Sequence, residues 1–304
     1  MTPAAPPTLF DRDHIARNRD RAAANYADYA FLKARESSHL IERLADVSRD
    51  FDEALDLGAH DGRVSEALLA SGQVDHVTAL ESSAGMVAAA KARGLRMVQG
   101  SEENLPFSAA SFDLVASVLS LHWVNDLPGA LVQVRQVLKP DGLFLGCLFG
   151  GGTLTELRTA LIEAESDLTG GVSPRISPLP SVQDMAALMQ RAEFALPVVD
   201  VDRVTVRYAS PLKLMDDLRG MGEQAAFAVR EGQSRRALSP RLIKRMADIY
   251  HDRFSDPDGK VRASFEVIWL SGWAPAENQP KPLKRGSAKT SLAEAVGKLG
   301  QETS

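Results

Sequence analysis

A glycine-bracketed turn, Ala54–Gly62, is the stretch whose residue types most directly indicate chemistry. It reads Ala-Leu-Asp-Leu-Gly-Ala-His-Asp-Gly, and helical spacing follows it over Arg63–Ala70. Gly58 and Gly62 let the backbone approach a ligand where a Cβ would collide, and Asp56 places an acceptor beside the turn. Strand, tight turn and helix start together predict a cradle for an adenosine ligand with a charged amino-acid end. We call this stretch the cradle.

A carboxylate follows at the separation that such a cradle predicts. Val74–Leu80 has the character of a second strand, and it ends at Glu81, 23 positions after Gly58. A carboxylate at the tip of this strand accepts the ribose hydroxyls of an adenosine, and the expected separation is about 20 residues. We therefore expect Glu81 to bind the ribose, with Ser82 and Met86 of the next helix beside the same ligand.

The spacing of the glycines decides between adenosine cofactors. The dinucleotide fingerprint Gly-x-Gly-x-x-Gly fails here at its second and third glycines, so NAD is disfavoured. The pattern Asp-x-Gly-x-His-x-Gly instead resembles the first motif of class I S-adenosylmethionine-dependent methyltransferases, with His60 in place of the middle glycine. The resemblance implies S-adenosylmethionine as cofactor and an adenine contact from Ser101 or Glu102. An imidazole at position 60 must point away from the ligand or narrow its pocket.

Polar and aromatic side chains gather after the fourth predicted strand, Ser111–Ser117. Ligands of open α/β sheets bind at the carboxyl ends of the strands, so we expect Ser117 to lie at the cofactor. Leu119–Asp126 follows and should face the ligand. In it, His122 either orients a substrate or relays a proton, or makes only a structural hydrogen bond. Trp123 is expected to form a wall of the pocket.

A long irregular loop over residues 170–180 contains one cation, Arg175. Loops of this kind over a pocket are often functional, so Arg175 is a candidate substrate anchor; the alternative is a surface arginine. The predicted site has no metal. Its predicted catalytic residues are His122, Trp123 and Arg175, and its predicted cofactor-binding residues are Asp56, Gly58, His60, Gly62, Glu81, Ser82, Met86, Ser101, Glu102 and Ser117.

Alternating strands and helices must position these residues. Their order predicts an α/β fold with a Rossmann-like class I methyltransferase sheet, mostly parallel with an antiparallel last strand. The predicted divisions are a disordered N-terminus (1–9), a helical lid (10–45), the S-adenosylmethionine-binding domain (46–150), cap helices and last strands (151–273), and a flexible tail (274–304) with a marginal helix over Ser291–Leu299. Residues 10–45 either cover the cofactor or pack as a solvated helix pair on the sheet edge.

Bulk composition excludes several classes of function. The 304 residues can bury a substantial core, and a net charge of −5 provides no global basic field for nucleic acid. The single cysteine, Cys147, excludes an intrachain disulfide and a multi-cysteine metal site. No apolar run reaches the roughly 18 residues that span a bilayer. We expect a cytoplasmic protein without a membrane span or a nucleic-acid partner, and the oligomeric state is not indicated.

Further motifs extend the resemblance along nearly the whole chain. The chain is similar to the respiratory complex I assembly factors of methyltransferase fold and their proteobacterial relatives in these stretches: Phe10-Asp11-Arg12, Ser120–Pro128, Leu138–Gly142, Phe149–Gly151, Thr153–Arg158, Ser173–Pro178, Met215–Glu223 and Arg285–Ala288. The shorter pattern His-Trp-x-x-Asp is also similar to the malonyl-carrier-protein methyltransferases of biotin synthesis.

Three functions follow from these observations. Methyl transfer is the default chemistry, because the sulfonium is already activated and the protein has mainly to align a nucleophile of a protein or small molecule. The resemblance to the assembly factors implies instead hydroxylation of an arginine of a complex I subunit. That reaction needs an oxidant, and the sequence contains neither a His-x-Asp…His facial triad nor a cysteine cluster. The third function is a cofactor-binding assembly protein without turnover, which His60 and Ser101 favour slightly.

Overall fold

A single seven-stranded sheet organises the computed structural model, which describes residues 8–228 and 237–279. The strand order is β3-β2-β1-β4-β5-β7-β6, with β7 antiparallel to both of its neighbours. The predicted mostly parallel sheet with an antiparallel last strand is therefore confirmed. The strands are β1 Phe51–Leu57, β2 Val74–Glu81, β3 Arg96–Gln99, β4 Phe112–Val118, β5 Leu138–Phe149, β6 Ala195–Tyr208 and β7 Val261–Trp273.

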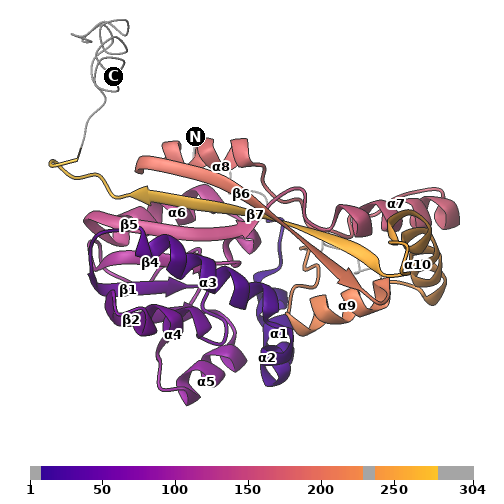
Figure 1. Ribbon diagram of the computed structural model, residues 1–304, viewed down its shortest axis with the longest axis horizontal. Helices are drawn as coiled ribbons and strands as arrows, with labels where there is room; N and C mark the ends of the chain where they lie inside the picture. Colours follow the sequence, from indigo (N-terminus) through magenta and orange to yellow (C-terminus); the bar gives the residue numbers. More distant parts are fainter. Residues whose placement is uncertain (1–7, 229–236, 280–304) are drawn as a thin grey trace, which may run out of the picture.

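Helices cover both faces of the sheet (Figure 1). Apolar side chains of α3 and α4 enter one hydrophobic core, and those of α6 and α8 enter the other. The helices and 3-10 turns described are α1 Arg12–Ala22, η1 Ala23–Asn25, α2 Tyr26–Tyr29, α3 Phe31–Ala45, α4 Arg63–Ala70, α5 Ala84–Ala92, η2 Leu121–Trp123, α6 Leu127–Val137, α7 Thr155–Thr169, α8 Val182–Arg191, α9 Pro211–Gly220 and α10 Pro240–Phe254.

Local sequence explains where these helices begin. The hydroxyl of Ser83 accepts the backbone N–H of Met86 at the start of α5, and the carboxylate of Asp126 accepts that of Gly129 at the start of α6. Such caps satisfy backbone donors that have no partner within the helix. The residue types predict such caps from Ser82 or Ser83 and from Asn125 or Asp126, with Asp126 favoured. The structure confirms Asp126 for α6, and Ser83 is the cap of α5.

The start of β5 differs from what its sequence predicts. Pro140-Asp141-Gly142 has the composition of a turn and predicts a strand from Leu143, yet β5 already begins at Leu138. The register against β4 slips here, because Leu138 pairs with Phe112 whereas Leu143 pairs with Leu114. Asp141 adopts a left-handed φ of 62° within the extra residues. The turn residues thus form an irregularity inside a longer strand.

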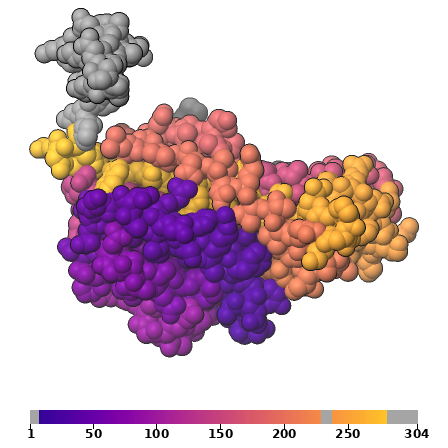
Figure 2. Space-filling model, viewed as in Figure 1, coloured from indigo at the N-terminus to yellow at the C-terminus, as the bar shows by residue number. Residues whose placement is uncertain are grey.

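The ends of β6 and β7 continue beyond the rest of the sheet. Phe149, the last residue of β5, pairs with Val267, while β7 starts six residues earlier, at Val261, opposite Tyr208. This two-stranded extension carries α7, α9 and α10, which form a second lobe at the right of Figure 1. Helices α1 and α2 contact α9, and Figure 2 shows the indigo N-terminal residues lying against this lobe.

Some predictions fall on residues that the structure does not describe. The predicted helix over Ser291–Leu299, and most of the predicted termini 1–9 and 274–304, lie outside the described residues. Within residues 8–228 and 237–279, no helix combines the length and the apolar character that a membrane crossing needs.

Candidate cofactor cradle and adjoining cavity

The cradle turn is fixed by backbone contacts between neighbouring strands. The N–H groups of Gly58 and Ala59 both donate to the carbonyl of Leu80, over 2.9 and 3.0 Å. Gly58 has a φ of +73°, and a Cβ on it would lie 2.1 Å from Oγ of Ser120. Only glycine fits here, because the conformation is left-handed and the exit of β4 presses against the turn.

Residues on either side of the turn are held by the helix and the strands that flank it. Gly62 has a φ of +82° and begins α4 without a side-chain cap. Asp56 is fully buried below the turn, where it accepts Oγ–H of Ser65 over 2.7 Å. Burial raises the pKa of Asp56 to about 6. Ser117 also points into the sheet, since its hydroxyl donates to the carbonyl of Leu57. Asp56 and Ser117 therefore make hydrogen bonds that fix the strand end and the helix start on the two sides of the turn.

Glu81 lies at the cradle, as its position in the sequence predicts. Its buried carboxylate accepts the backbone N–H of His60 over 3.0 Å and that of Ser83 over 2.9 Å. The hydroxyl of Ser82 donates to the same group over 3.1 Å. Gly58 and Glu81 thus line one place, which is the arrangement that an adenosine ligand needs.

Glu102, rather than Ser101, faces the cradle. The carboxylate of Glu102 is fully buried and accepts Oγ–H of Ser120 over 2.7 Å as well as the guanidinium of Arg12. Burial alone would raise the pKa of Glu102, but the charges of Arg12 and Arg19 hold it below its ordinary value. Ser101 instead accepts the backbone N–H of Glu103 in a turn.

Two cations from the N-terminal helices enter the cradle. Nη1 of Arg19, on α1, donates to both carboxylate oxygens of Glu81, over 3.1 and 3.2 Å. Nζ of Lys33, on α3, donates to the carbonyls of Gly58 and Val118, over 2.8 and 3.0 Å. Both side chains are buried. Neither was predicted as a site residue.

His60 contacts these helices. Its Nδ1 lies 2.8 Å from Nζ of Lys33 and 3.2 Å from the hydroxyl of Tyr26, and its Nε2 has no hydrogen-bond partner. Burial, followed by the charges of Arg19 and Lys33, lowers the pKa of His60 well below its ordinary value. The imidazole is therefore neutral and Nδ1 accepts from Lys33. Met86 packs nearby, in an apolar cluster with Tyr26.

A cavity of about 890 Å³ adjoins the cradle. It lies between η2, α7, α9 and the loop that contains Arg175, and all three predicted catalytic residues line it. His122 and Trp123 meet on one carboxylate, that of Glu223. Nε2 of His122 lies 3.0 Å from Oε2 of Glu223, and Nε1–H of Trp123 donates to the same oxygen over 2.7 Å.

Glu223 stays charged despite its burial. Burial alone would raise the pKa of Glu223, but the contacts with His122, the charge of Arg19 and the bond from Trp123 lower it overall. Glu223 and Phe149 also line a second, much smaller cavity of about 20 Å³ against Tyr26, Lys33 and His60. These two residues therefore separate the large cavity from the cradle.

Arg175 is held by a neighbour in the wall of the large cavity. Its Nη2 donates to Oε1 of Glu165 over 2.8 Å, and its side chain is only 14% exposed. Glu165 also accepts the backbone N–H of Ser173, so α7 fixes the loop. The alternative of a surface arginine is wrong. Whether Arg175 anchors a substrate stays a prediction.

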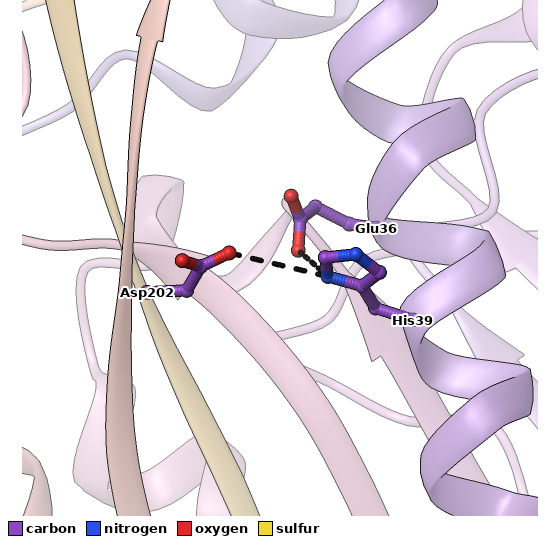
Figure 3. A group of neighbouring side chains, drawn as sticks. All are labelled: Glu36, His39 and Asp202. Atoms are coloured by element: carbon purple, nitrogen blue, oxygen red, sulfur yellow. Dashed lines mark ion pairs between the residues drawn. The ribbon is translucent and has the colours of Figure 1, made fainter.

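A further group of possible metal ligands lies between α3 and β6. Figure 3 shows Glu36, His39 and Asp202 turned toward one another, with Nδ1 of His39 3.6 Å from Glu36 and 4.0 Å from Asp202. The guanidinium of Arg35 pairs with both carboxylates. Arg43 pairs with Asp200 on the same strand. We interpret the group as an ion-pair network that attaches α3 to β6, because Arg35 already pairs with both carboxylates.

Comparisons with known proteins agree with this geometry. A methyltransferase-domain family model matches residues 55–146. The chain is 39% identical over 298 residues to the arginine-hydroxylase NDUFAF5, mitochondrial, of Danio rerio, covering 96% of this chain and 91% of that protein. The human protein of the same name is 38% identical over 297 residues, 96% of this chain and 84% of that protein. A malonyl-[acyl-carrier protein] O-methyltransferase of Xylella fastidiosa is 34% identical over 273 residues, 88% of this chain and 89% of that protein.

Solved structures share the fold at lower identity. The YcgJ protein of Bacillus subtilis superposes with a TM-score of 0.55 at 18% identity, covering 79% of this chain and 99% of that one. A putative methyltransferase of Bacillus halodurans gives the same TM-score at 17% identity, covering 78% and 97%. The predicted resemblance and the predicted fold are both confirmed. The chain therefore belongs to the methyltransferase-fold family that includes the arginine-hydroxylase NDUFAF5 proteins, and its cofactor is S-adenosylmethionine.

Proposed function

We propose that the protein hydroxylates an arginine side chain of a respiratory complex I subunit, with S-adenosylmethionine bound at the cradle. The reaction type follows the name of the relatives that match 96% of the chain. The observation that carries the proposal for this chain is Glu223, a carboxylate that is 11% exposed in the wall of a large cavity beside the cradle.

A charged carboxylate in a mostly apolar wall favours a cationic guest. The lining includes the side chains of Phe149, Leu157, Leu161 and Phe265, so the field of Glu223 is screened less there than in water. A guanidinium matches a carboxylate in charge and in planar geometry. An arginine of a protein segment that enters the cavity would therefore be drawn toward Glu223.

The remaining residues position and enclose the substrate. His122 and Trp123 fix the Glu223 carboxylate, and Glu165 fixes the loop of Arg175 over the opening. Gly58, Glu81 and Glu102 would hold the cofactor, because the turn leaves room for its backbone contacts and the carboxylates accept its hydroxyl and amino groups. S-adenosylmethionine supplies an activated methyl group when bound. Replacing a carbon-bound hydrogen of arginine by a hydroxyl needs dioxygen in addition, together with two electrons and two protons from a reductant: one oxygen atom enters the hydroxyl and the other leaves as water.

Methyl transfer is the second candidate, favoured by the malonyl-carrier-protein relative that matches 88% of the chain. One experiment separates the two. The purified protein is incubated in air with S-adenosylmethionine, a reductant and the arginine-containing complex I subunit of the same cell, and the subunit is analysed by mass spectrometry. Hydroxylation adds the mass of one oxygen atom to the peptide, and methylation adds the mass of one methylene group.

Two results together would contradict both reactions. The subunit stays unmodified in this experiment, and the arginine has the same modification in cells with and without the gene. A cofactor-binding assembly protein without turnover would then remain. The cytoplasm stays the predicted compartment, and fractionation of cells with an antibody against the chain tests it.

A further inference from the structure

The cradle is filled by the chain's own cations. The guanidinium of Arg19 contacts three side chains that lie beside the cradle. Its Nη1 donates to Glu81 and lies 3.7 Å from Glu102, and its Nη2 donates to Oγ of Ser120 over 3.2 Å. The side chain of Arg19 is 0% exposed. Its contacts are therefore made in a place from which water is excluded.

Lys33 fills a second position. Its ammonium has three acceptors within 3.0 Å, the carbonyls of Gly58 and Val118 and Nδ1 of His60. Gly58 and Val118 stand at the ends of the adjacent strands β1 and β4. Two strand-end carbonyls that converge on one point form a binding site for an amine. That site is beside the turn where the amino-acid end of the cofactor is expected.

Charge explains why these cations are drawn in. Asp56, Glu81 and Glu102 are all fully buried around the turn, and buried carboxylates are costly unless they are paired. Arg19 donates to Glu81, and Lys33 donates to the carbonyl of Gly58 in the turn. S-adenosylmethionine brings a sulfonium, an ammonium and a carboxylate, together with ribose hydroxyls that need Glu81 as acceptor. Its hydroxyls therefore compete with Arg19 for Glu81, and its ammonium competes with Lys33 for the strand-end carbonyls.

We propose that α1 is a self-binding lid, which keeps the cradle closed by placing Arg19 on Glu81, the expected ribose acceptor, while Lys33 of α3 occupies the carbonyls expected to bind the ammonium of S-adenosylmethionine. The inference rests on the cofactor assigned above and adds how its access is regulated. Binding requires Arg19 and Lys33 to leave these groups and α1 to move away from α5. The closed form leaves one buried donor without a partner, because Nε of Arg19 makes no hydrogen bond. This unpaired donor disfavours the closed form.

A latch holds the lid on α5. Oδ1 of Asp20 accepts Oγ–H of Ser83 over 2.6 Å and the backbone N–H of Gly85 over 2.8 Å. A Cβ on Gly85 would lie 3.2 Å from Cβ of Ala23. That separation is close to the range of about 3.5–4.5 Å found across disulfides, so cysteines at positions 23 and 85 can lock the lid. The single native cysteine, Cys147, is buried and does not interfere.

The test is calorimetric titration of S-adenosylmethionine into the Ala23→Cys/Gly85→Cys protein. The inference predicts binding at least 10-fold weaker in the oxidised protein than in the same protein after reduction, and oxidant-treated wild type is the control. Equal affinities of the oxidised and reduced proteins would overturn the lid and leave the cofactor assignment intact. Absence of binding in every form, wild type included, would overturn the cofactor and the lid together.

A second pair of variants tests Arg19 itself. Arg19→Met should bind S-adenosylmethionine at least 5-fold more tightly than wild type, because the competitor is gone. Arg17→Met, on the exposed face of the same helix, should leave the affinity unchanged. Hydrogen exchange of the wild type provides a readout that does not depend on whether Arg19→Met folds. Addition of the cofactor should speed the exchange of the backbone amides over 12–22. Weaker binding by a folded Arg19→Met, or slower exchange over 12–22, would identify Arg19 as a cofactor ligand and overturn the proposal.

Discussion

Nε2 of His122 lies 3.0 Å from Oε2 of Glu223, although 100 residues of the chain separate the two. The bond joins η2, which follows β4, to the segment after α9, and so links the cofactor domain to the second lobe. Because Trp123 donates to the same oxygen, the carboxylate is fixed in one orientation at the border of the large cavity and the cradle. This placement makes Glu223 the residue on which substrate recognition is expected to depend most.

Replacing Glu223 by Gln should reduce modification of the subunit and spare the cofactor. A charged hydrogen-bond partner contributes about 1.5–3 kcal/mol, which corresponds to about a 10- to 150-fold loss in kcat/KM. Glu163→Gln is the matched control, because that side chain pairs with Arg253 and does not line the cavity. Unchanged modification by Glu223→Gln would remove the basis for a cationic substrate.

Glu81→Ala should weaken the binding of S-adenosylmethionine. Charge-assisted hydrogen bonds to the ribose are lost, and the expected cost is about 1–3 kcal/mol in calorimetric titration. The substitution also leaves Arg19 buried with Glu102 alone, so the ligand-free protein should unfold at lower temperature. The exposed Glu42→Ala should change neither property, and Glu81→Gln replaces Ala if the variant does not fold. An unaltered affinity would mean that the ribose lies elsewhere.

Lys33 gives a dependence of stability on pH whose sign can be worked out. Burial lowers the pKa of Lys33 to about 8, from an unfolded value of 10.5. Below pH 8 both states hold the proton, and the folded protein bears the cost of a buried ammonium. As the pH rises above 8, the folded state releases the proton first, so stability should rise with pH through this window.

Chemical denaturation of wild type and Lys33→Met between pH 8 and pH 9.5 checks this sign. The free energy of unfolding of the wild type should gain about 1.6 kcal/mol over the variant across those 1.5 pH units. Subtracting the variant removes the contribution of the other titrating groups. A difference that stays flat or falls with pH would show that folding does not lower the pKa of Lys33.

The cofactor half of the site could be predicted because it is local in the sequence. Gly58 and Glu81 follow consecutive strands of one βαβ unit, and right-handed crossovers bring such ends together in any fold of this class. The cations that fill the cradle depend on how α1 and α3 are rotated. Position 19 does share a helical stripe with the buried Ile15 and Ala22. An arginine on an apolar stripe is therefore the signal that was overlooked.

The signal for Glu223 is weaker, because it ends the stretch Met215–Glu223 that carries the family resemblance but nothing local assigns it a role. It lies in an irregular segment after α9, and its neighbours in the cavity come from η2, α7 and a loop far away in the chain. The choice between Ser101 and Glu102 likewise needed coordinates, since both can reach an adenine. What settles it is the orientation of one turn relative to Ser120 and Arg12.

Comparison of Gly58 with Gly72 separates the cost of the left-handed backbone from the cost of a clash with Ser120. Gly58 and Gly72 have φ values of +73° and +76°, but a Cβ at Gly58 meets Oγ of Ser120 at 2.1 Å, whereas a Cβ at Gly72 meets nothing within 4 Å. Gly72→Ala should therefore cost only the left-handed backbone, about 1–2 kcal/mol of unfolding free energy. Gly58→Ala adds the clash with Ser120, about 1–3 kcal/mol more. It should also weaken S-adenosylmethionine binding, which Gly72→Ala leaves intact. Equal losses of stability in urea titrations of the two variants would show that Ser120 yields, and that the cradle is wider than its backbone indicates.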